Sequence, residues 1–517
     1  MSITATDNTS RSKRIALNSV VLFIRMFAIM AINLYAVRIV LSALGDIDYG
    51  VFNTIAGVVL TSSFLTSTLA TSIQRFYSYA HGEGATMRLK QIFSASMNII
   101  LILCVIVLLI LETVGLWFVN TQLTIPAELT TTVQWLYQFV ILTLMFSFVQ
   151  IPYNAAIFAR EDMGVFAFIS LLDCIGRLLV AVIISKWIIA NHLLMYGAGL
   201  LVVAFIIFLA YSLYARTHYT ECHYCRGTGK QLYKELLSFS GFTTYSSLAG
   251  ISIIHGNTIL LNIFFGPVAT ASYAIANQIH NALTALGNSI VIAFRPVMVK
   301  AYAEKNTSYL DSLFYVSNKF IFYLLLCASI PLIIEMPVIL DWWLKASSVQ
   351  MVLFSRCFVV FMLLFMLHNP ITTIIHSTGQ IKYYTLWVDS ITMLCLPVTW
   401  LFYYLGAPDY YCFISMVVVY AAAHICRLIC LRIYYPSFSY VAYATSLILP
   451  AIIVAFLSSL VAYSIHTSLD DSLIEFLAVS ISTPLTVCLL AYFFGLTGKE
   501  RHLLRSFAVQ YINRKRI

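Results

Sequence analysis

Apolar runs of about twenty residues recur along the whole length of this 517-residue chain. Each run is long enough to cross the roughly 30 Å hydrocarbon core of a bilayer as an α-helix. Only 10% of the residues are charged and 61% are hydrophobic, whereas a soluble protein is about a quarter charged. We therefore predict an all-α polytopic membrane protein with fourteen spans. They are expected at residues 15–43, 51–74, 92–118, 131–158, 164–189, 192–215, 239–264, 270–294, 316–340, 349–375, 383–406, 409–431, 441–465 and 472–494.

The positions of lysine and arginine agree with this count. The two tails and the loops that follow even-numbered spans contain most of them, for example Arg75, Arg160 and Lys382, whereas the opposite loops contain only Lys186 and Lys345. By the positive-inside rule, both termini are expected to be cytoplasmic. The net charge of +9 is thus explained by topology, and no nucleic-acid partner is expected.

The chain also repeats itself. Gly45 and Gly266 follow the first and seventh spans 221 residues apart, and Pro152 and Pro370 are 218 residues apart. An even number of spans separates the copies, so the two halves share one orientation, and transporters of this kind bind substrate between their halves. We predict an N-lobe over residues 1–215, a cytoplasmic tether over 216–238 and a C-lobe over 239–431. Two further helices over 432–497 and a basic cytoplasmic tail over 498–517 follow.

One arginine lies inside the first span. A charge at the centre of a membrane helix costs about 2.5–3.5 kcal/mol and normally faces a bundle interior or a watery cavity. Arg25 shares one helical face with Asn33, and we predict that both line a cavity for an anionic ligand. Arg38 lies roughly opposite, near the outer end, where it lines the cavity, extends to the lipid headgroups or pairs with Asp46 or Asp48.

The eighth span has a continuous polar face, which predicts contact with water or with another polar helix. The face occupies an arc of roughly 100° on an otherwise apolar helix. We assign it to the substrate cavity, together with His255 from the seventh span. The residues of this face are Tyr273, Asn277, His280, Asn281, Thr284 and Asn288.

Two carboxylates fall inside spans and are candidates for coupling transport to H⁺ or Na⁺. Asp173 precedes Arg177 by four residues, an order that also favours a neutral intrahelical pair. Asp389 has no basic residue within one turn of its own helix and occupies the equivalent position in the second repeat. His424 and Arg427 are expected at the membrane interface.

No cofactor and no metal site is expected. The eleven cysteines follow no extracellular spacing, and most fall within spans, where cysteine behaves as a small apolar residue. Cys222 and Cys225, with His218 nearby, form an isolated C-x-x-C, which is weak evidence for zinc without a second pair.

Two six-helix repeats followed by two extra helices resemble the multidrug/oligosaccharidyl-lipid/polysaccharide exporter superfamily, and within it the polysaccharide-specific Wzx-type flippases. The resemblance rests on the basic start at 11–14, on Leu44 to Phe52, on Gln74 to Tyr77 and on Phe294 to Pro296. It implies a non-enzymatic MATE-like protein of the bacterial inner membrane that flips an undecaprenyl-pyrophosphate-linked oligosaccharide, an O-antigen or capsular repeat unit, by alternating access. Membrane lipids, a polysaccharide polymerase and a chain-length regulator are the partners that it implies.

Two other functions are considered. A MATE-type multidrug/cation antiporter is favoured by Asp173 and Asp389, although such a protein usually has twelve helices and an acidic cavity. A membrane glycosyltransferase or polysaccharide polymerase generally needs a sizeable outer loop for its acceptor and catalytic acids. With spans of about twenty residues or more, the segments left between them on the outer side are short, and none exceeds roughly fifteen residues.

Overall fold

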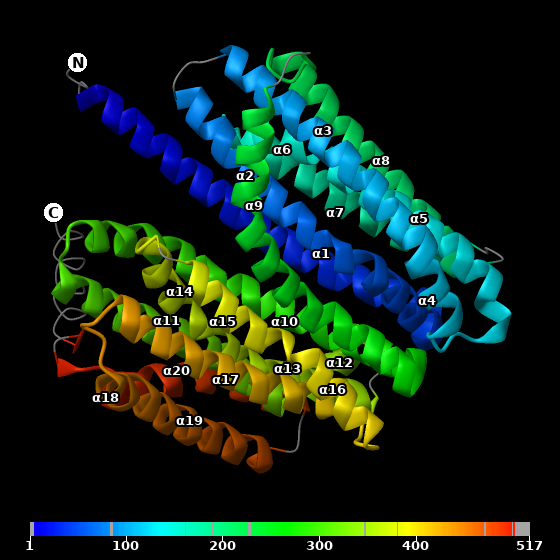
Figure 1. Cartoon of the computed structure of the whole chain (residues 1–517). Helices are drawn as coiled ribbons and strands as arrows, with labels where there is room; N and C mark the ends of the chain where they lie inside the picture. Colours follow the sequence, from blue (N-terminus) through cyan, green and yellow to red (C-terminus); the bar gives the residue numbers. More distant parts are fainter. Residues whose placement is uncertain are drawn as a thin grey trace. The chain divides into compact units, whose positions relative to one another are not determined.

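The computed structural model describes residues 5–82, 86–160, 162–187, 191–225, 229–345, 348–379, 381–469, 472–498 and 500–501. Within them the secondary structure is entirely helical, as predicted (Figure 1). The chain forms two compact units. The first holds residues 1–274 and 399–409, and the second holds residues 275–398 and 410–517.

Within the described residues, the first unit contains nine helices and the start of a tenth. They are α1 (Ala5–Leu60), α2 (Phe64–Gly82), α3 (Thr86–Ile110), α4 (Leu116–Thr121), α5 (Thr130–Val149), α6 (Ile151–Ala159), α7 (Met163–Lys186), α8 (His192–His218), α9 (Lys230–Ile251) and the beginning of α10 (Asn257–Ala303).

The second unit takes the rest of α10 and the helices that follow. They are α11 (Thr307–Ile334), α12 (Met336–Leu344), α13 (Val349–Met366), α14 (His368–Ser377), α15 (Lys382–Met393), α16 (Cys395–Tyr404), α17 (Tyr411–Tyr434), α18 (Tyr440–Tyr443), α19 (Leu449–Ser468) and α20 (Ser472–Leu490). The last residues of α16, from Thr399, belong to the first unit.

Fourteen spans are present, as predicted. Twelve helical stretches of the described chain are long and apolar enough to cross a bilayer, and two of them, Arg25–Tyr77 and Thr244–Ala303, have 53 and 60 residues. Each of these two is broken at a glycine with positive φ: Gly45 at φ 72°, ψ 175° and Gly266 at φ 81°, ψ −173°. This backbone conformation is not helical and is essentially restricted to glycine. Each glycine therefore interrupts its helical stretch and separates two spans.

The same features recur in both halves of the chain. The glycine breaks have one conformation, and Pro152 and Pro370 each lie in the first turn of a short helix, α6 and α14, where proline is tolerated. Helices α19 and α20 follow the second repeat and pack on each other and on α11. The architecture is that of two six-helix repeats with two additional helices.

Helix α3 shows how the bilayer shapes the surface. Ile100, Cys104 and Val107 are buried on one side, whereas Ile102 and Leu109 on the other are 62% and 60% exposed. A helix that is apolar on all sides and packed on one of them presents the other side to lipid. The charged residues of this helix, Arg88 and Lys90, are confined to its first turns.

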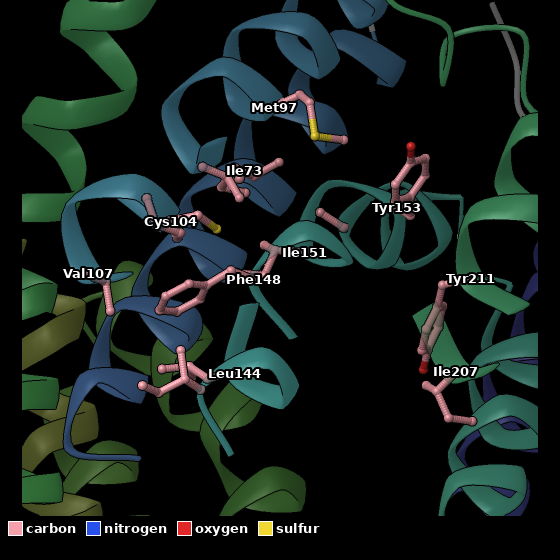
Figure 2. Packing of buried hydrophobic residues seen from close by; sticks show 14 of the residues in the cluster. Ile73, Met97, Cys104, Val107, Leu144, Phe148, Ile151, Tyr153, Ile207 and Tyr211 are labelled. Atoms are coloured by element: carbon pink, nitrogen blue, oxygen red, sulfur yellow. The ribbon is translucent and has the colours of Figure 1, made fainter. Parts of the chain in front are cut away.

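The core of the first unit includes residues of α1, α2, α3, α5, α6, α7 and α8. Figure 2 shows Ile73 and Cys104 near Phe148 and Ile151, with Tyr211 on α8. One approach within this unit requires glycine, because a Cβ on Gly50 would lie 1.8 Å from the carbonyl oxygen of Pro267.

The predicted tether is shorter than expected. α8 extends to His218 and α9 begins at Lys230, so the last part of the predicted tether forms the first turns of α9. α9 packs on α2 and α3 of its own unit. The basic tail 498–517 lies almost wholly outside the described residues, and the lobe boundaries stay a prediction.

Candidate functional site

Arg25 is held against α7 within the first unit. Its Nη1 donates a hydrogen bond of 3.1 Å to Oγ of Ser170, and its guanidinium carbon lies 4.7 Å from the centre of the Phe166 ring. Its Nε is buried and has no acceptor. Within the described part of the chain no carboxylate pairs with Arg25, and the titratable group that interacts with it electrostatically is Tyr211.

These contacts leave Arg25 an incompletely satisfied cation. A guanidinium has five N–H donors in a planar fork and keeps its charge in proteins. A hydroxyl and an aromatic face fix its position but do not neutralise it. The geometry therefore leaves donors and a full positive charge for an anionic ligand.

The other two residues predicted on the first span are placed differently. Asn33 is exposed, and its Oδ1 lies 3.4 Å from Sγ of Cys174 on α7, so Asn33 and Arg25 face the same helix. Arg38 is half-buried. In the described structure it forms no ion pair with Asp46 or Asp48, so the pairing considered for it is not present.

Asp173 is neutralised within its own helix. Arg177 Nε lies 3.0 Å from Oδ1 of Asp173, which is the intrahelical pair anticipated from their spacing. The Arg177 and Asp173 side chains are 48% and 32% exposed, so the pair remains accessible.

Asp389 has a partner that its own helix does not reveal. α15 packs on α17, and the Asp389 carboxylate interacts electrostatically with Arg427. Arg427 and His424 are 4% and 8% exposed, so both side chains are buried within the protein, and their place at the membrane interface stays a prediction. The guanidinium of Arg427 lies 4.5 Å from the centre of the Tyr420 ring. Because a helical wheel describes one helix only, a partner from α17 was invisible in the sequence.

The polar face of α10 is divided between packing and exposure. Asn281 and Asn288 are exposed, and Asn277 and Thr284 are half-buried. His280 is 3% exposed, and its ring centre lies 5.0 Å from that of Phe358 on α13.

Packing thus accounts for one edge of this face. The Thr284 hydroxyl also donates a hydrogen bond of 2.8 Å to the backbone carbonyl of His280. Tyr273 is buried and belongs to the first unit. The assignment of all six side chains to a substrate cavity stays a prediction.

His255 lies in a π-helical turn, Ser252–Gly256, between α9 and α10. It is half-buried. Such turns are frequent at functional sites because they interrupt the regular hydrogen bonding of a helix. The predicted cavity role of His255 rests on this position alone.

The two cysteines of the C-x-x-C segment lie in different environments. Burial raises the pKa of the Cys222 thiol to about 12, which keeps it protonated, and the backbone N–H of Cys225 donates to Oγ of Ser94 at 2.8 Å. Among the described residues, the one group of three metal-binding side chains that converges lies elsewhere, at Glu335, His466 and Glu475. No sequence motif indicated this group, because its members are 131 and 9 residues apart.

Known proteins support this description at the level of the fold. The structure is similar to the lipid II flippase MurJ in an inward closed conformation, with a TM-score of 0.67 and 12% identity over 93% of this chain and 98% of that one.

It is also similar to a multidrug resistance MATE family transporter in an inward-facing conformation, with a TM-score of 0.63 and 13% identity over 80% of this chain and 99% of that one. A third similar structure is a transporter of the same superfamily from Pyrococcus furiosus, described as having a binding pocket of reversed polarity, with a TM-score of 0.54 and 15% identity over 80% of this chain and 95% of that one.

Sequence comparison adds no relative, since no protein-family model and no curated protein matches the chain. At 12–15% identity the structural likeness establishes the fold alone. The chain is therefore a multi-pass membrane protein with the helical fold that MurJ and the MATE transporters share.

Proposed function

We propose that this protein is a flippase that moves an undecaprenyl-pyrophosphate-linked oligosaccharide, an O-antigen or capsular repeat unit, to the outer leaflet of the bacterial inner membrane. The observation that carries the proposal is Arg25. It is an intramembrane cation held by Ser170 and Phe166, with no carboxylate beside it in the described structure. A planar fork of charged donors is the preferred partner of a pyrophosphate.

The intramembrane acids support an anionic cargo over a cationic one. A MATE-type multidrug/cation antiporter would bind its substrate or coupling ion through carboxylates that are available. Here Asp173 is bonded to Arg177, and Asp389 interacts with Arg427. A proton or sodium ion that binds either carboxylate would have to compete with an arginine in the same unit.

The extra helices support a lipid-linked cargo. The comparison with MurJ, a lipid II flippase by its description, extends over 93% of this chain, whereas the MATE comparison extends over 80%. α19 and α20 present apolar side chains outward, among them Phe456 and Leu485, at 64% and 66% exposure. Such surfaces suit contact with acyl or polyprenyl chains.

Deletion of the gene separates the three candidate functions. We expect loss of surface glycan, with the lipid-linked unit retained in the inner leaflet. Drug sensitivity with intact glycan would instead indicate the antiporter. A membrane glycosyltransferase or polymerase would be indicated by loss of the completed lipid-linked unit or of its polymerised form, with flipping intact.

Complementation of that deletion tests Arg25 directly. We expect Arg25→Ala to lose surface glycan and Arg25→Lys to restore it in part, because lysine keeps the charge and loses the fork. Lys300→Ala is the matched control, since it removes a cation from an exposed pair, Lys300–Glu304, with 76% and 56% exposed side chains. Membrane levels of each variant are measured by immunoblot. Full complementation by Arg25→Ala would exclude the proposed anion site.

A further inference from the structure

Three side chains from three helix ends meet in the second unit. Glu335 caps the C-terminus of α11, His466 lies in the last turn of α19, and Glu475 lies in the first turn of α20. His466 Nδ1 is 3.1 Å from Oε1 of Glu335 and in direct contact with Oε1 of Glu475. One potential ligand atom from each residue lies within 4.8 Å of the other two.

The charges of this cluster are not balanced by its own members. The Glu335 side chain is 0% exposed, and its second oxygen, Oε2, is buried with no hydrogen-bond partner. Burial of a carboxylate is unfavourable unless its charge and its lone pairs are both compensated. If both carboxylates are ionised, a single imidazolium cannot neutralise them, and the cluster then has room for a further positive charge.

An approach from the surface remains open. The His466 and Glu475 side chains are 35% and 13% exposed. A small cation can therefore reach the cluster without unfolding the helices. By the predicted topology this end of α11, α19 and α20 faces the outer side of the membrane.

We propose that Glu335, His466 and Glu475 form a binding site for a divalent transition-metal ion, with Zn²⁺ as the first candidate. Three protein ligands of nitrogen and oxygen, with a fourth position for water, form an established zinc coordination pattern. The imidazole disfavours Mg²⁺ and Ca²⁺, which prefer oxygen. Zinc bonds of about 2.0–2.1 Å in a tetrahedron place ligand atoms about 3.3 Å apart, close to the 3.1 Å between His466 and Glu335. The closer His466–Glu475 contact must lengthen to admit the ion.

Metal binding here would link the two extra helices to the second repeat. α11, α19 and α20 share a core that includes Leu326, Val454 and Val479. An apolar groove of about 370 Å³, lined by Ile333 and Phe456 among others, lies between α11 and α19 beside the cluster. A bound ion would fix the separation of these two helices at the end of the groove. The proposal does not depend on what the protein transports.

A titration of the purified, EDTA-treated full chain with Zn²⁺ tests the site. We expect one zinc per chain by elemental analysis and a melting temperature that rises with zinc concentration, because a ligand of the folded state stabilises it. Replacing zinc with Co²⁺ should give visible absorption bands. In His466→Ala and Glu335→Gln the affinity should fall by at least about 100-fold, beyond the loss typical of an outer-shell partner.

Controls separate this site from other zinc ligands and from misfolding. His223→Ala and Cys225→Ser remove alternative ligands beside Cys222 and should bind zinc as the wild type does. His466→Cys replaces the imidazole with another zinc ligand, so this variant should still bind zinc. A plain ion pair would be lost in the same variant.

Three results would overturn the proposal. They are the absence of saturable zinc binding in the wild type, unchanged affinity in Glu475→Gln and His466→Ala, and loss of binding in Cys225→Ser. The first would identify the cluster as an ion-pair network only, and the last would move the site to the C-x-x-C segment.

Discussion

At the scale of single residues, a buried charge is held by a partner that is distant in the sequence. Arg160, just beyond α6, forms two hydrogen bonds to Glu221, from Nε at 2.7 Å and Nη2 at 2.9 Å, and lies over the Tyr219 ring. These hydrogen bonds raise the pKa of Arg160 further above its usual range, although burial opposes them. Glu221 is 3% exposed, and among the described residues it forms its ion pair with Arg160.

We expect Arg160→Ala to lower the free energy of unfolding by about 1.5–3 kcal/mol, because it leaves a buried carboxylate without its partner. The free energy of unfolding of Arg160→Lys should lie between those of Arg160→Ala and the wild type, since lysine cannot form the two parallel hydrogen bonds. Thermal unfolding in detergent measures both. Lys300→Ala, which breaks an exposed pair, should change stability by less than about 0.5 kcal/mol. Equal effects of Arg160→Ala and Lys300→Ala would contradict this account.

At the scale of helices, two glycines decide where long helical stretches become two spans. Gly45 and Gly266 adopt the same left-handed, extended conformation at equivalent places in the two repeats. Their surroundings are open: nothing would lie within 4 Å of a Cβ added to Gly45, and only the Thr124 methyl reaches 4.0 Å at Gly266. The requirement for glycine therefore comes from the backbone alone.

Gly45→Ala and Gly266→Ala should each cost about 1–3 kcal/mol, the range for a side chain forced into this region. Gly250→Ala in α9 is the control, because it is helical with open space around it and alanine favours helix. Melting temperatures of the three variants measure the difference. If Gly250→Ala were as destabilised as the other two, the penalty would not arise from the positive φ.

At the scale of the whole molecule, an even number of spans predicts that both termini lie on one side of the membrane. The excess of lysine and arginine in the loops after even-numbered spans predicts that this side is cytoplasmic. A green fluorescent protein fused after residue 517 should therefore fluoresce, and alkaline phosphatase fused there should be inactive. Fusions in the loop after span thirteen, around Leu469, should show the opposite pattern. Phosphatase activity at the C-terminus would require an odd number of spans or an inverted orientation.

Sequence by itself determined the number of spans, their approximate limits, the two breaks at Gly45 and Gly266, and the Asp173–Arg177 pair. Each depends on residues close together in the chain. Each apolar run is long enough to cross the hydrocarbon core of a bilayer. Glycine alone tolerates a positive φ combined with an extended ψ, and residues four apart lie next to each other on a helix. The repeat was also visible, because equivalent landmarks recur at near-constant spacing.

Tertiary structure alone decided which charges are compensated. Arg427 of another helix interacts electrostatically with Asp389, Ser170 and Phe166 hold Arg25, and α13 buries one edge of the polar face of α10. The Glu335–His466–Glu475 cluster joins ends of three helices and leaves no mark in the sequence. Contacts between helices depend on which faces pack together and in what register. The periodicity of a single helix specifies neither the packed face nor the register.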